Sequence, residues 1–169
     1  ILTDQSTGGV LTNKYAYVTA SGGTIWRHTI PSNGALQTGT NAEVLAGTNA
    51  PSLRVISQKI TGQGDRRAYV VNAAANEIQL YLLSRVTGAL LLANSYPTGA
   101  GPGPLVFNAA GTVAYVPNAG DNTVSVYSVS LATGFLAPLG SPVATGPTPV
   151  FMTLDPGGTL AYVVNAGDG

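Results

Sequence analysis

One short pattern recurs four times along the chain, and its spacing is the strongest limit on the possible folds. Each copy joins a tyrosine to strand-forming residues, as in Tyr115-Val116-Pro117-Asn118. The steps between successive copies are 52, 46 and 47 residues, counted over Tyr17, Tyr69, Tyr115 and Tyr162. After Tyr115 come a turn rich in Asn, Gly and Asp, an alternating segment over 123–129, and a second turn at Thr133-Gly134. Alternation and turn chemistry of this kind predict a repeated β-meander.

A repeat of this length with four strands per copy predicts a β-propeller, because propeller blades recur at about 40 to 50 residues. A single four-stranded sheet has two faces and cannot bury both alone. Sheets that stack around an axis cover one another. Pro-led segments at 51–56, 102–107 and 149–154 precede the tyrosine strands and are expected to be the innermost strands. The tyrosine–valine stretches are interpreted as sheet core, which informs the fold and not the chemistry.

The predicted fold is all-β, a propeller of four-stranded antiparallel blades in one unit over residues 1–169. The expected blades are blade 1 at about 1–40, blade 2 at about 41–90, blade 3 at about 91–136 and an incomplete blade 4 at about 137–169. This is roughly three and a half blades, and common rings have four or more. Residues 1–4 are interpreted as the tail of an innermost strand. We therefore expect the chain to be part of a larger ring.

Charge is sparse and balanced, with seven basic residues, seven acidic residues and 8% charged residues in total. Without a basic stripe, nucleic acid is not expected as a partner. No apolar run approaches about 18 residues, so no membrane span is predicted. The absence of cysteine excludes disulfides and thiolate metal sites. A surface of small neutral polar residues favours an extracellular, periplasmic or cell-surface protein of a bacterium or archaeon.

Two groups of ionisable residues are interpreted as structural. His28 lies in the expected outer strand 24–30, where packing or an edge hydrogen bond is the favoured role. The pair Arg66 and Arg67 is expected at a solvated loop tip, with contact to a partner as the alternative. The chain has no Gly-x-Ser-x-Gly nucleophile elbow, so no catalytic residue is assigned.

Candidate ligand-binding residues lie at the expected mouth of the central channel. In a propeller, the loops that lead into the inner strands share one face with the ends of the second strands. The predicted binding residues there are Ser52, Arg54, Asn72, Asn118 and Asn165. Arg54 is a candidate anchor for an anion or carboxylate. The alternative is an ion pair between Arg54 and an acidic residue of a neighbouring loop.

Two pairs of oxygen-bearing residues resemble part of a calcium site. Asn118 occurs with Asp121, and Asn165 occurs with Asp168. Calcium requires six to eight oxygen ligands, and too few carboxylates converge here. Turn formation is the favoured role of both pairs, and neither a metal nor a cofactor is predicted.

The combination of Tyr115-Val116-x-Asn118, a Gly-Asp turn, Val124-Ser125-Val126-Tyr127 and Thr133-Gly134-x-Leu136 resembles the YVTN-type β-propeller repeat. The repeat is shared by lactonase-like seven-bladed propellers, including 6-phosphogluconolactonases and a carboxymuconate cyclase, and by surface-layer proteins. The resemblance implies a seven-bladed ring. It also implies a histidine where an inner strand of the enzymes begins. The matching positions here are Ser52, Gly103 and Val150, so the resemblance implies no catalytic histidine in this portion.

Three functions follow from these observations. The leading hypothesis is a secreted or cell-surface binding or scaffold module for a protein or saccharide. The alternative is a lactonase-like hydrolase or cyclase that acts on a sugar lactone or carboxylate in the central channel. The third is a structural repeat of an extracellular layer or filament. In each case, further blades from the same longer chain or from another copy are expected to close the ring.

Overall fold

The computed structural model describes residues 14–19, 24–30, 41–45, 52–56, 66–84 and 88–168. These residues form β-strands and turns, with one short 3-10 helix at Ala166–Asp168. Within these ranges no helix is long and apolar enough to cross a membrane. The predicted all-β, antiparallel fold is confirmed. The predicted inner-strand tail at residues 1–4 lies outside the described residues.

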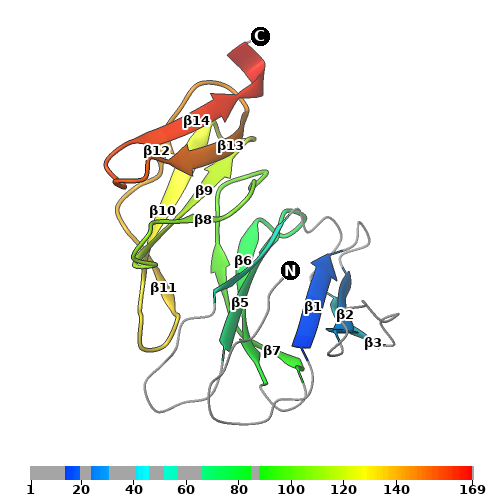
Figure 1. Cartoon of the computed structure of the whole chain (residues 1–169). Coiled ribbons are helices and arrows are strands. Elements are labelled where there is room, and N and C mark those ends of the chain that lie inside the picture. Colours follow the sequence, from blue (N-terminus) through cyan, green and yellow to red (C-terminus); the bar gives the residue numbers. More distant parts are fainter. Residues whose placement is uncertain are drawn as a thin grey trace.

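The strands form four antiparallel sheets that follow one another in chain order (Figure 1). The first sheet has the order β1 (Lys14–Thr19), β2 (Thr24–Ile30), β3 (Asn41–Leu45). The second has the order β4 (Ser52–Ile56), β5 (Arg66–Asn72), β6 (Glu77–Leu83), β7 (Leu90–Pro97). The third has the order β8 (Val106–Phe107), β9 (Val113–Asn118), β10 (Thr123–Val129), β11 (Leu136–Pro138), and β12 (Val143–Ala144) also pairs with β10. The fourth consists of β13 (Pro149–Leu154) and β14 (Ala161–Asn165).

Three of the four sheets extend a few residues past the approximate blade boundary that the repeat suggested. β3 starts at residue 41 but pairs with β2 of the first sheet, and β7 continues to residue 97 in the second. Both β11 and β12 belong to the third sheet, which therefore reaches residue 144. The reason is that the strand after each Thr-Gly-x-Leu turn folds back on the preceding strand as a hairpin. In this article a blade is one of these four sheets, numbered in chain order.

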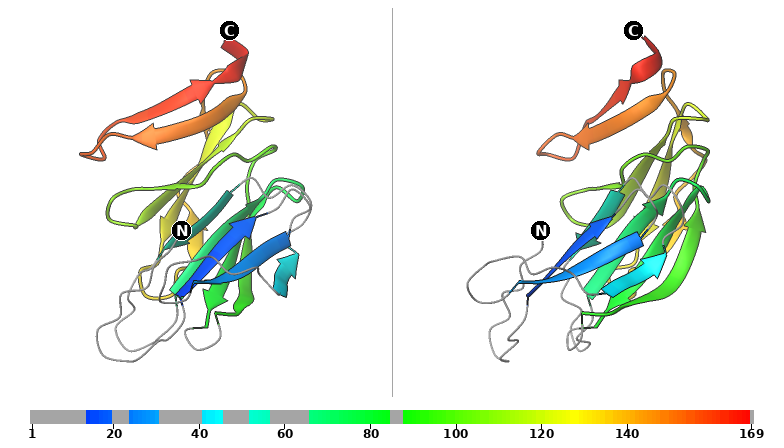
Figure 2. Two further views of the ribbon diagram at one scale, coloured as in Figure 1. Left: turned by 45° about the vertical axis from the view of Figure 1, so that its right-hand side comes forward. Right: turned by 90° about the vertical axis from the view of Figure 1, so that its right-hand side faces the viewer.

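The hydrophobic core lies between neighbouring blades. Figure 2 shows the ribbons of these blades from two further directions. Alternate side chains of β5 point to opposite sides of the sheet, as strand geometry requires. Tyr69 and Val71 pack toward blade 3, whereas Ala68 and Val70 pack with Ile25 of blade 1. All five side chains are at most 2% exposed. A strand buried on both sides explains the near-continuous apolar sequence of β5.

Two of the recurring tyrosines also join their blade to the next by a hydrogen bond. The Tyr17 hydroxyl donates to the carbonyl of Gly88 at 2.6 Å, and the Tyr69 hydroxyl donates to the carbonyl of Gly134 at 2.7 Å. Each acceptor is the glycine of a Thr-Gly-x-Leu turn in the following blade, and each glycine has a positive φ. The tyrosine and the glycine turn of the repeat are therefore partners across the blade interface.

The expectation for Arg67 is wrong. Arg67 lies on β5, is 2% exposed, and reaches the turn between β10 and β11 of blade 3. Its Nη2 donates to the Ala132 carbonyl at 2.6 Å and its Nη1 donates to the Leu131 carbonyl at 3.3 Å. Arg67 shares the blade-3 side of β5 with Tyr69 because the two are separated by two residues. Burial lowers the pKa of Arg67 from its ordinary value, and nearby Tyr69 opposes that shift.

Candidate functional site

The innermost strands β4, β8 and β13 are edge strands of blades 2, 3 and 4. The structure places Ser52 and Arg54 on β4, where their backbones pair with Val71 and Tyr69. The side chains of both residues lie outside the described part of the structure. Their assignment to ligand binding therefore stays a prediction.

In blades 3 and 4, the loop that leads into the innermost strand is held against the turn that follows the second strand of the same blade. We call residues 98–103 and 145–149 the approach loops of blades 3 and 4. In blade 3, Ala119 N and Gly120 N donate to the carbonyls of Gly101 and Ala100, both at 2.9 Å. In blade 4, residues 166 and 167 donate in the same way to the carbonyls of residues 148 and 147, at 2.9 and 3.1 Å.

This pairing leaves little room between loop and turn. A Cβ on Gly120 would stand 3.0 Å from the Ala100 Cβ, which is tighter than ordinary contact. Backbone groups and small side chains thus form the described part of the channel mouth. The glycines in the approach loops and turns are explained by this close approach of two backbones.

The predicted asparagines hold these turns in place. Asn118 is fully buried, and its Nδ2 donates to Thr123 Oγ1 at 3.0 Å and to Ser125 Oγ at 2.9 Å. Asn72 is 4% exposed and its Oδ1 accepts from Ala75 N at 3.2 Å. These hydrogen bonds of Asn118 and Asn72 stabilise the strand ends and turns of their own blades. Their role in ligand binding is not tested and stays a prediction.

An acceptor atom remains without a donor in two blades. Asn118 Oδ1 and Asn165 Oδ1 are buried and have no hydrogen-bond partner among the described residues. A glycine lies against each of these amides: a Cβ on Gly99 would stand 2.7 Å from Asn118 Cγ, and one on Gly146 would stand 2.6 Å from Asn165 Nδ2. Any larger residue at either glycine would displace the asparagine.

The last two residues of the Asn-Ala-Gly-Asp-Asn turn bind two different approach loops. Asp121 Oδ2 accepts from Ala100 N at 2.7 Å within blade 3. Asn122, with φ of 56°, has an Oδ1 that accepts from Thr148 N of blade 4 at 2.8 Å. The turn of blade 3 therefore orients its own approach loop and the next one.

Blade 2 repeats the second contact. Asn76, with φ of 53°, has an Oδ1 that accepts from Gly101 N of blade 3 at 3.0 Å. The sequence showed the turn chemistry but not this connection between blades. The signal that would have revealed this connection is a nearly constant sequence separation between each such asparagine and its partner in the next approach loop. The separation is 25 residues for Asn76 and 26 residues for Asn122.

The ionisable side chains of the described part of the chain do not converge at the approach loops. Asp121 is engaged by a backbone amide, and the search of the described residues finds no group of three or more His, Cys, Asp or Glu side chains that could hold a metal ion. His28 lies on β2, the middle strand of the first sheet, opposite Ala16. General acid–base chemistry needs a titratable group beside the substrate. The described approach loops and turns supply no imidazole for that role.

Comparison with known proteins identifies the family. The family described as "Lactonase, 7-bladed beta-propeller" matches residues 12–154, which is most of the chain. No match was found among curated proteins.

Solved structures show the same fold at low sequence identity. A protein of Bacteroides uniformis with a provisional 6-phosphogluconolactonase name has a TM-score of 0.71 and 19% identity, over 91% of this chain and 45% of its own. The periplasmic gluconolactonase PpgL of Pseudomonas aeruginosa has a TM-score of 0.67 and 18% identity, over 90% and 44%. A functionally unknown protein of Desulfotomaculum acetoxidans has a TM-score of 0.61 and 24% identity, over 85% and 44%. The chain spans less than half the length of these structures.

The family match extends from β1 into β13 and so includes the inner-strand geometry and the approach loops. It agrees with the resemblance that the tyrosine repeat indicated. The chain belongs to the lactonase family of seven-bladed β-propellers.

Proposed function

We propose that the chain is part of a lactonase-like propeller that binds and hydrolyses a sugar lactone in its central channel. The observation that carries the proposal is the family match over residues 12–154. The names of two structural neighbours, a provisional 6-phosphogluconolactonase and a gluconolactonase, support the same reaction class. This reading replaces a binding module as the leading hypothesis.

In this proposal, Arg54 anchors the acidic end of the substrate. A guanidinium presents paired donors that match a carboxylate or a phosphate. Arg54 is on β4, an edge strand of blade 2. The approach loops then orient the lactone through backbone amides and carbonyls.

The group that activates water is proposed to come from blades other than the four described sheets, in the same longer chain or in another copy. The outer face of blade 4 supports the presence of another blade. Tyr162 and Val164 occupy the repeat positions of Tyr69 and Val71. Tyr162 is 56% exposed and Val164 is 54% exposed, whereas their counterparts, covered by blade 3, are 2% and 0% exposed.

The test is hydrolysis of δ-gluconolactone and 6-phosphogluconolactone by the purified protein with its ring complete, as the longer chain or as an assembly of copies, measured as acid release at constant pH. We expect saturable turnover, and we expect Arg54→Ala to raise KM at least tenfold for the phosphorylated substrate. Arg27→Ala is the matched control, because it removes the same charge from β2 in blade 1. Equal loss in both variants, or no turnover by the unaltered protein, would refute the proposal.

The second candidate is a binding or scaffold module for a protein or saccharide, outside the cytoplasm. It is favoured by the low charge and by a mouth built from backbone and small side chains. Saturable saccharide or protein binding without lactone turnover would support it. A third role, as a structural repeat in an extracellular layer or filament, would use the exposed face of blade 4 and would produce ordered assemblies visible by electron microscopy.

A further inference from the structure

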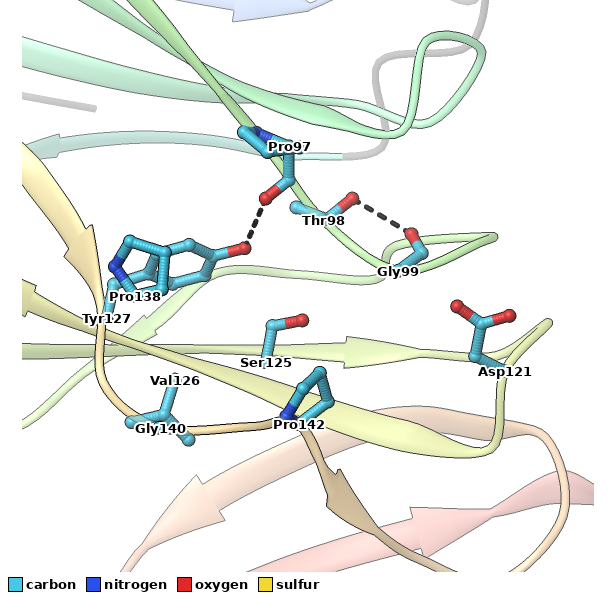
Figure 3. A pocket seen from close by; sticks show the side chains of 10 residues that line it. All are labelled: Pro97, Thr98, Gly99, Asp121, Ser125, Val126, Tyr127, Pro138, Gly140 and Pro142. Atoms are coloured by element: carbon cyan, nitrogen blue, oxygen red, sulfur yellow. Dashed lines mark hydrogen bonds between the residues drawn. The ribbon is translucent and has the colours of Figure 1, made fainter.

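A pocket lies between blades 2 and 3, away from the innermost strands. It is enclosed by the end of β7 and the following approach loop on one side, and by β10 and the loop between β11 and β12 on the other (Figure 3). Its volume is about 330 Å³. Ligand pockets begin at about 300 Å³, so this one fits a single small ring and not an extended molecule.

Two departures from the pattern of blade 2 create the space. Ser125 stands on β10 where blade 2 has Gln79, since each precedes a recurring tyrosine by two residues. Gln79 fills its position and accepts from the Tyr81 hydroxyl at 2.8 Å. Ser125 is shorter and leaves the equivalent volume open beside Tyr127.

The second departure is in the outer strand. In blade 2 this strand, β7, is continuous over Leu90–Pro97. In blade 3 it is divided into β11 and β12, and the chain between them bulges away from β10. Gly140, with φ of 79°, and Pro142 come from this bulge and line the pocket.

The walls of the pocket are of two kinds. Pro97, Pro138, Pro142 and the ring of Tyr127 form an apolar side. Ser125, Thr98 and the Asp121 carboxylate supply oxygen atoms around the rest of the pocket (Figure 3). The lining residues include neither lysine, arginine nor histidine. An anionic ligand would therefore meet a carboxylate without a compensating cation, which is unfavourable.

The polar side-chain groups of the pocket are oxygen atoms, and the Thr98 hydroxyl already donates to the Gly99 carbonyl at 2.9 Å. Tyr127 donates its hydroxyl to the Pro97 carbonyl at 2.6 Å. Ser125 Oγ accepts from the buried Asn118, which lies directly behind it and beside Gly99. A ligand that fits must bring hydroxyl donors and an apolar face.

We propose that the pocket between blades 2 and 3 binds a neutral pyranose ring, with the apolar C–H face of the sugar against the prolines and Tyr127. The sugar hydroxyls donate to the Asp121 carboxylate, which lines the pocket. No residue of the innermost strands β4, β8 and β13 lines this site, and it needs neither Arg54 nor lactone turnover. For one sugar ring, the usual binding free energy per atom corresponds to a Kd on the order of 1 mM.

The test is titration of the full chain with methyl β-glucopyranoside, followed by two-dimensional NMR of the backbone amides. We expect saturable shifts at Gly99 and Gly140. Gluconate carries similar hydroxyls and a negative charge, and we expect it to bind here at least tenfold more weakly. No saturable shift up to about fifty times the expected Kd would overturn the proposal.

Ser125→Gln is the decisive variant, because it places in blade 3 the side chain that blade 2 already holds at the same position. We expect at least a tenfold loss of pyranoside affinity. Ser141→Gln is the matched control, since Ser141 is exposed in the same bulge and does not line the pocket. Unchanged affinity in Ser125→Gln would place the sugar elsewhere and overturn the proposal. The shifts at Gly99 and Gly140 in the unaltered chain keep the test valid if the variant fails to fold.

Discussion

Gly134 is the position where one methyl group should test the contact between blades most directly. It has φ of 76°, a backbone conformation that alanine adopts only at a cost. A Cβ there would overlap Arg67 Cδ, stand 2.6 Å from Arg67 Nε, and lie 3.0 Å from the Tyr69 hydroxyl. Arg67 cannot retreat without losing its bonds to the Leu131 and Ala132 carbonyls.

The expected cost of Gly134→Ala has two parts. The left-handed backbone costs about 1–2 kcal/mol for a residue with a Cβ. Displacement of Arg67 removes at least one hydrogen bond from a charged donor, worth about 1.5–3 kcal/mol. We therefore expect the free energy of unfolding to fall by about 3–5 kcal/mol, a large part of the roughly 5–15 kcal/mol of a typical domain.

Chemical denaturation followed by circular dichroism measures this loss, and Gly140→Ala is the matched control. Gly140 has φ of 79° with nothing within 4 Å of an added Cβ, so only the backbone cost of about 1–2 kcal/mol applies. In an Arg67→Ala background the cost of Gly134→Ala should shrink toward that of the control. Equal losses in Gly134→Ala and Gly140→Ala would refute the reasoning.

Two further predictions concern pH and the turn of blade 3. Burial raises the pKa of Tyr69 and of Tyr81 to about 12, and both lie above the unfolded value of about 10. The contribution of these two tyrosines to stability is complete below pH 10 and is lost as the pH rises toward 12. We therefore expect the denaturation midpoint to stay constant up to pH 10 and then to fall. A midpoint that stays constant to pH 12 would contradict this. Asn122→Ala should cost about 1–2 kcal/mol in thermal unfolding, because the positive φ is strained and Thr148 N loses its acceptor. Asn122→Gly should recover about half, and no difference between the two variants would show that φ is not the cause.

The strands and their order could be predicted because their signals are local. Alternating apolar residues define β5 and β10, and Asn, Gly and Asp define the turn between β9 and β10. The repeated tyrosine then places these strands in successive blades. The sequence gives the blade boundaries only approximately, because a repeat has no natural starting point in a sequence.

The candidate site was only partly predictable. Asn118 was recognised at the end of a strand, but its burial depends on Gly99, a residue that precedes it by 19 positions and lies against its amide. The sequence does not indicate which way the Asn118 side chain points. A propeller mouth formed by backbone pairing resembles ordinary loop sequence, rich in glycine and proline.

By itself, the sequence determined the repeat, the all-β antiparallel class and the membership of a propeller family, because period and turn chemistry act within a few residues. Only the tertiary structure decided how the blades are joined. Arg67 was expected in solvent, yet it binds carbonyls 64 and 65 residues away in the next blade. Ser125 carries no signal of its own, yet it lines a pocket at the position where blade 2 has the larger Gln79. Both features depend on the distance and orientation between stacked sheets, which arise only when the blades pack together.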